Sequence, residues 1–64
     1  MKKIELIEGN LYEDGCGVYE YAYSTGELYC FYEVVFEDEL GNYHLADSRT
    51  MLTQTEVKYL TALN

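Results

Sequence analysis

The sequence has few of the residues that mark secreted or membrane-spanning proteins. It contains two cysteines, Cys16 and Cys30, among 64 residues, too few for a disulfide-dense secreted scaffold. No apolar run follows Lys2 and Lys3, so the N-terminus lacks the pattern of a signal peptide. No stretch approaches the roughly 20 apolar residues that a membrane span requires. We therefore expect a cytoplasmic protein with reduced thiols and no membrane partner.

Basic residues are also scarce. Four lysines and arginines stand against twelve aspartates and glutamates, and the formal net charge is -8. This charge opposes direct binding to nucleic acid or anionic lipid, because those partners carry the same sign. Hydrophobic residues make up 48% of the chain, which argues against disorder. We expect one domain over residues 1–64, and a homodimer that adds stability, because so short a chain buries only about 60% of its unfolded surface.

Patterns for catalysis and metal binding are missing. A nucleophilic thiol must lie close to the imidazole that activates it, but we place Cys16 in a loop and Cys30 on the sheet face opposite His44. The cysteines and the histidine lack the spacing of a zinc site, and Asp38 and Glu39 do not fit a calcium loop. We therefore expect no enzyme activity, no metal and no cofactor, and we expect both cysteines to be small buried hydrophobes.

Alternation of apolar and polar residues predicts a small antiparallel sheet. The predicted strands cover residues 3–7, 18–23, 27–37 and 43–47. Glycine-containing turns at residues 24–26 and 38–42 join the last three strands into two hairpins. Leu11 and Tyr12 lie between two turn-rich segments, and we expect them to anchor a loop or a short strand.

A capping box marks the start of a helix. The Thr53 hydroxyl can accept a hydrogen bond from the Glu56 amide, and the Glu56 carboxylate can reach back. Leu52 and Val57 occupy the two positions of a hydrophobic staple. An apolar stripe continues along the helix through Val57, Leu60 and Leu63. The predicted helix runs from residue 54 to about 63 and must pack on the sheet. The predicted fold class is α+β, with three to four antiparallel strands and one C-terminal helix packed on one face.

Strand register decides which face of the sheet forms the core. In the register that we favour, Tyr23 pairs with Leu28, and Phe36 pairs with Tyr43 in the next hairpin. One face is then almost wholly apolar or aromatic: Tyr19, Tyr21, Tyr23, Leu28, Cys30, Tyr32, Val34, Phe36, Tyr43 and Leu45. The helix can cover this face.

The second face combines carboxylates with large apolar groups. It holds Val18, Glu20, Ala22, Tyr29, Phe31, Glu33, Val35, Glu37, His44 and Ala46. This face either packs against the N-terminal strand or a second subunit, or it binds a partner protein. A three-residue loop instead places Tyr21 opposite Tyr29 and mixes the two faces, so we favour the first register.

The acidic residues carry the main functional signal. Glu33 and Glu37 recur about 13 Å apart on one face of a strand, and residues 37–39 are all acidic. Carboxylates fixed on a rigid sheet can occupy the places of phosphates in the basic groove of a DNA-binding enzyme. A solvated acidic surface that only aids solubility is the alternative. The candidate partner-binding residues are Glu20, Tyr29, Phe31, Glu33, Val35, Glu37, Asp38 and Glu39.

The segment from residue 32 to residue 60 resembles the small phage-encoded uracil-DNA glycosylase inhibitors. The matching residues are Tyr32, Glu33, Val34, Asp38, Gly41, Tyr43, Leu52, Thr53, Glu56 and Val57. The resemblance implies a small acidic homodimer that imitates DNA and takes the DNA-probing loop of the glycosylase into an apolar pocket. It implies phosphate-mimicking roles for Glu33, Glu37 and Asp38. It also implies a pocket wall made of Tyr32, Tyr43 and Tyr59.

Charge and resemblance together lead to one expected function. We expect a DNA-mimicking inhibitor of a nucleic-acid enzyme, with uracil-DNA glycosylase as the named target, that occupies the DNA-binding groove in the host cytoplasm. Two alternatives stay open. One is an inhibitor of another host-defence nuclease, such as a CRISPR effector. The other is a small homo-oligomeric structural or regulatory module without an enzyme target.

Overall fold

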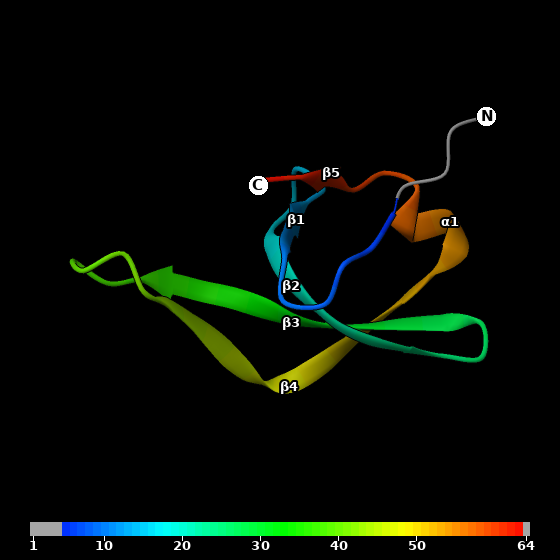
Figure 1. Ribbon diagram of the computed structural model, residues 1–64, viewed down its shortest axis with the longest axis horizontal. Helices are drawn as coiled ribbons and strands as arrows, with labels where there is room; N and C mark the ends of the chain where they lie inside the picture. Colours follow the sequence, from blue (N-terminus) through cyan, green and yellow to red (C-terminus); the bar gives the residue numbers. More distant parts are fainter. Residues whose placement is uncertain (1–4, 64) are drawn as a thin grey trace.

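The computed structural model describes residues 5–63 and shows a mostly β protein (Figure 1). Its elements are β1 (Leu11–Glu13), β2 (Val18–Thr25), β3 (Leu28–Glu37), β4 (Tyr43–Thr53), α1 (Gln54–Val57) and β5 (Thr61–Ala62). The five strands form one antiparallel sheet in the order β4-β3-β2-β1-β5. The predicted antiparallel sheet is confirmed. The predicted α+β class is wrong, because a single short helical turn is too little for that class. Within residues 5–63, no helix has the length and apolar character needed to cross a membrane.

The two predicted hairpins form the long part of the sheet. β2 runs two residues beyond its predicted end at residue 23, β3 begins one residue after its predicted start at residue 27, and β4 runs six residues beyond its predicted end at residue 47. Thr25 pairs with Leu28, so the loop of the first hairpin consists of Gly26 and Glu27. Gly26 has a positive φ of 58°. Glycine tolerates this conformation because it has no Cβ.

The predicted C-terminal helix is only four residues long. Its capping box is confirmed: Thr53 Oγ1 accepts from the Glu56 amide at 3.3 Å, and the Thr53 amide donates to Glu56 Oε1 at 2.9 Å. The chain then turns into β5, and the Leu63 amide donates to the Leu11 carbonyl at 3.0 Å. Pairing of β5 with β1 satisfies backbone groups along that edge of the sheet, and this tertiary pairing ends the helix early.

The strand predicted at residues 3–7 is absent from the part of that segment that the structure describes. Residues 3 and 4 lie outside the described residues, and residues 5–7 are not in a strand. The side chain of Tyr12 fastens this segment instead. Its hydroxyl accepts from the Ile7 amide at 2.8 Å and donates to the Glu5 carbonyl at 3.3 Å. Leu11 and Tyr12 are both buried in β1, so their predicted anchoring role is confirmed.

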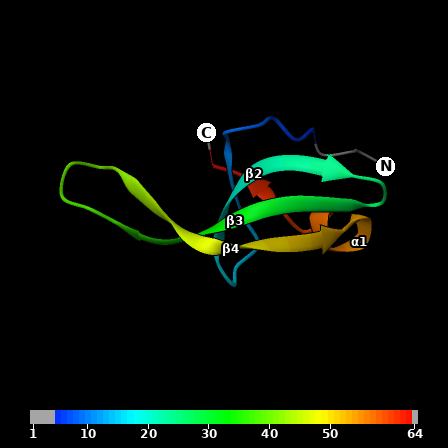
Figure 2. The same cartoon turned by 90° about the horizontal axis from the view of Figure 1, so that it is seen from below.

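The core lies between the β2–β3–β4 part of the sheet and the segment that carries β1, α1 and β5. These three elements cover the same side of the sheet (Figure 2). The buried cluster consists of Tyr12, Tyr21, Phe31, Leu52, Val57 and Leu60, with Leu6, Tyr19 and Tyr29 packed against it. Phe31 is 0% exposed and lies at its centre. Its ring centroid is 6.4 Å from that of Tyr12, 6.2 Å from that of Tyr19 and 5.3 Å from that of Tyr21.

A register shift in the first hairpin overturns the predicted division of the faces. Tyr23 pairs with Cys30, not with Leu28, whereas Tyr21 pairs with Phe31. The shift between Tyr21 and Tyr23 leaves Ala22 as an extra residue, and such a bulge exchanges the faces along one strand. Tyr21 therefore shares the core face with Phe31, while Tyr23 lies on the other face. The alternative register, with Tyr21 opposite Tyr29, is not observed either, because Tyr29 pairs with Ser24.

The second hairpin also departs from the predicted register. Phe36 pairs with His44, not with Tyr43, and Tyr43 pairs with Glu37. Two register shifts separate this pairing from the regular part of the sheet, one between Tyr32 and Val34 and one between Val34 and Phe36. The outer half of the hairpin is therefore set apart from the core-forming half.

Candidate protein-interaction surface on the β3–β4 hairpin

The outer part of the β3–β4 hairpin projects from the body of the protein. We call residues 34–45 the hairpin arm. It extends sideways away from β1, α1 and β5 in both views (Figures 1 and 2), and the molecule measures 38 Å along its longest axis against 22 and 20 Å along the others. Four large apolar side chains of the arm are exposed: Val35, Phe36, Leu40 and Tyr43. The arm therefore presents several apolar side chains to solvent, away from the body of the protein.

Asp38 holds the turn of the arm in one shape. Its Oδ1 accepts hydrogen bonds from the amides of Leu40 and Asn42, both at 2.9 Å. The Asp38 amide donates to the Asn42 carbonyl at 2.9 Å, and the Gly41 amide donates to the Asp38 carbonyl at 3.1 Å. Gly41 has a φ of 84°, which a residue with a Cβ rarely adopts. These bonds hold the backbone of the turn in one conformation.

His44 contacts the turn of the arm and Phe36. Its Nε2 lies 3.0 Å from Asp38 Oδ2, and its ring stacks on Phe36 with centroids 4.2 Å apart and planes 8° from parallel. The hydrogen bond from His44, followed by that from the Asn42 amide, lowers the pKa of Asp38. Cys30 is buried in the sheet as predicted, but Cys16 is exposed, so its predicted burial is wrong.

The pH dependence of the turn follows from the lowered pKa of Asp38. Because the folded pKa lies below the unfolded value of about 3.9, this carboxylate stabilises the turn above that pH, and the contribution is lost as pH falls through the folded pKa. In an NMR titration, the Leu40 and Asn42 amide shifts are expected to change with a midpoint below the usual aspartate range. The Asp38→Asn variant should abolish this transition. If the amide shifts titrate unchanged in that variant, or if the midpoint in the original chain equals the ordinary aspartate pKa, the transition does not report a lowered pKa of Asp38.

Half of the predicted partner-binding residues belong to the arm. These are Val35, Glu37, Asp38 and Glu39. All but Asp38 are exposed, and Asp38 is partly exposed. The three consecutive carboxylates therefore surround the turn at the end furthest from the core.

The other half is divided between the core and two separate surfaces. Phe31 is fully buried and Tyr29 packs against the core, so both belong to a face that packs within the protein and not to an exposed partner-binding surface. Glu33 lies across the strand from Tyr19, on the core side of the sheet, where its carboxylate remains exposed. Glu20 pairs with Tyr32 and lies on the opposite side. The structure therefore does not bring the eight predicted residues together.

Three apolar residues of the arm were missed as surface residues. The predicted register placed Phe36 and Tyr43 in the core, but the register shifts leave both exposed on the arm. Leu40 had a readable signal in the sequence, because it is a large apolar residue inside a turn between Glu39 and Gly41. A turn residue has no strand partner and little chance of reaching the core.

A second group of acidic residues surrounds Tyr19. Burial comes first among the causes that raise the pKa of its hydroxyl, followed by the nearby carboxylates of Asp14 and Glu33. In the part of the chain that the structure describes, no group of three or more cysteine, histidine or acidic side chains is arranged to hold a metal ion.

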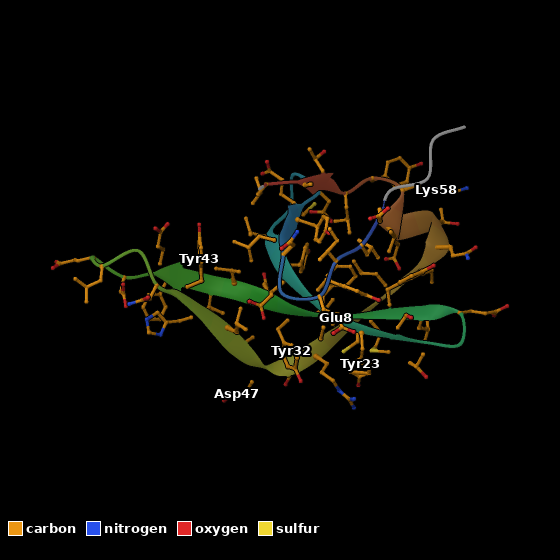
Figure 3. All side chains as sticks on the ribbon, in the orientation of Figure 1. Glu8, Tyr23, Tyr32, Tyr43, Asp47 and Lys58 are labelled. Carbon is orange, nitrogen blue, oxygen red and sulfur yellow. The ribbon has the colours of Figure 1, made fainter. Side chains whose placement is uncertain are left out.

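The three tyrosines of the implied apolar pocket lie apart from one another. Tyr32 lies in the middle of β3, Tyr43 begins β4 on the arm, and Tyr59 is exposed after α1. Figure 3 shows Tyr43 and Tyr32 at separate places along the hairpin. On the sheet face near Tyr32, the Arg49 guanidinium donates a hydrogen bond to the Tyr23 hydroxyl. These tyrosines therefore do not form the wall of a single pocket.

Comparison with known proteins adds no relative to this description. No protein-family model, no curated protein and no solved structure matches the chain. The resemblance to the glycosylase inhibitors therefore stays a prediction.

Proposed function

We propose that this protein is an acidic inhibitor of a nucleic-acid enzyme, and that the hairpin arm docks into the basic DNA-binding groove of that enzyme. The observation that carries the proposal is the position of three consecutive carboxylates, Glu37, Asp38 and Glu39, at the end of a projecting arm. A narrow hairpin can enter a groove that excludes the body of the protein.

The electrostatics of the chain support this role. The net charge of -8 attracts a basic groove over distances of about a Debye length, roughly 8 Å at physiological salt, and repels nucleic acid itself. The hydrogen bonds within the turn hold the Asp38 carboxylate and the backbone on either side of it in place. Such preorganisation lowers the entropy that binding must remove.

Uracil-DNA glycosylase is the target that we propose first, as the resemblance implies. The test is removal of uracil from duplex DNA by the purified enzyme with increasing amounts of this protein. We expect inhibition that weakens as salt is raised, since charge pairs carry the association. Full glycosylase activity at micromolar excess rules this target out. The same assay with a purified CRISPR nuclease then tests the nearest alternative.

A homo-oligomeric module is the second candidate function. The exposed apolar side chains of Val35, Phe36 and Tyr43 favour it, because a second copy of the chain could cover them. Sedimentation analysis across a range of protein concentrations tests the oligomeric module. A strict monomer excludes this module and also weakens the resemblance to the homodimeric glycosylase inhibitors, whereas a dimer is compatible with both functions.

A further inference from the structure

The most exposed large apolar side chain of the arm is at its tip. Leu40 is 88% exposed, although its backbone is held firmly. Its amide donates to Asp38 Oδ1 at 2.9 Å, and its neighbours Glu39 and Gly41 are exposed as well. A leucine in this position gains nothing from folding, because it stays in water when the protein folds.

The surroundings of Leu40 combine carboxylates and apolar side chains. Glu37 and Tyr43 are cross-strand partners on one face of the arm, whereas Phe36 and His44 are partners on the other. Phe36 and Tyr43 are also exposed. The tip therefore presents one apolar side chain inside an acidic rim, with further apolar area on both faces behind it.

We infer that Leu40 is an anchor residue that inserts into an apolar pocket bordered by lysines or arginines on a partner protein. The inference rests on the proposed function and names the kind of groove that the arm fits. The acidic rim complements basic residues around such a pocket, and an anchor that fills a central pocket contributes strongly to an interface. The arrangement is the reverse of the one that the resemblance implied, because here the apolar group projects and the partner supplies the pocket.

Two synthetic peptides of equal charge test this inference without a known target. Both carry the same number of lysines, and the intervening residues are leucine in one and serine in the other. In NMR titrations, we expect the leucine peptide to bind about tenfold more tightly or better and to shift the resonances of residues 38–43. Leu40→Ser should remove this preference. Ile7→Ser is the matched control, because Ile7 is 51% exposed outside the arm, and it should leave the preference intact.

Three outcomes overturn the inference. Equal affinity for both peptides means that charge alone drives binding. A preference that survives in Leu40→Ser places the apolar contact elsewhere. The third outcome comes from spectra recorded without peptide. If the arm resonances shift with protein concentration, and Leu40→Ser abolishes those shifts, a second copy of this chain is the occupant.

The inhibition assay separates failure of this inference from failure of the proposed function. If Leu40→Ser inhibits the target enzyme as well as the original chain does, the inhibitor function stands and the anchor role fails. If the original chain inhibits neither enzyme but keeps a Leu40-dependent preference for the leucine peptide, the anchor stands and the inhibitor function fails.

Discussion

Replacement of Phe31 by alanine is expected to destabilise the protein by about 3–5 kcal/mol. The Phe31 side chain is completely buried and contacts the rings of three tyrosines from β1 and β2. Its removal leaves a cavity that the strands can fill only in part. A core of this size rarely supplies more than about 3–5 kcal/mol of net stability, so the variant should be largely unfolded at room temperature. Urea unfolding followed by circular dichroism measures the loss.

Phe36→Ala is the matched control for this experiment. Phe36 has the same side chain and lies on the same strand, but it is 56% exposed and stacks only on His44 among the aromatic contacts of the described residues. We expect a loss below about 1 kcal/mol, since few contacts disappear and no cavity forms. Similar losses in the two variants would show that the arm, too, belongs to the stabilising core.

Neutralising the arm is expected to slow binding to the target enzyme more than neutralising other acidic residues. The double change Glu37→Gln and Glu39→Gln removes two carboxylates beside the tip. We expect the association rate to fall by about tenfold or more at low salt, because electrostatic steering depends on where the charge is placed. The difference should shrink as salt is raised. Stopped-flow mixing with uracil-DNA glycosylase at several salt concentrations measures this rate.

The control for total charge is the double change Glu8→Gln and Glu27→Gln. Both glutamates are exposed and lie outside the arm, in the turn before β1 and in the β2–β3 turn. The two double variants have the same net charge, so a general effect of charge slows both equally. Equal association rates in the two variants would remove the arm from the proposed interface, even if inhibition persists.

Local features of the fold were readable from the sequence. The turn at residues 38–42 and the capping box of Thr53 and Glu56 appear where predicted. Both depend on residues a few positions apart, so the same side chains that define the pattern also make the contacts. The acidic cluster of the arm was found for the same reason, because its members are consecutive.

The division of the sheet into faces was not readable. The favoured register was chosen because it separated apolar from polar side chains most cleanly. The extra residue Ala22 in β2 breaks that separation, placing Phe31 in the core and Glu20 on the side away from Glu33. A bulge leaves little mark in the alternation of the sequence, since its position is set by how the neighbouring strands pack.

The sequence by itself determined the acidic character, the two hairpins, the tight turns and the start of the helix. These properties follow from composition and from contacts between near neighbours. Only the tertiary structure decided that β5 pairs with β1 instead of continuing the helix, and that the outer half of the β3–β4 hairpin leaves the core. Both outcomes depend on contacts between residues far apart in the chain. Leu40 is exposed inside an acidic rim because the outer half of the β3–β4 hairpin leaves the core.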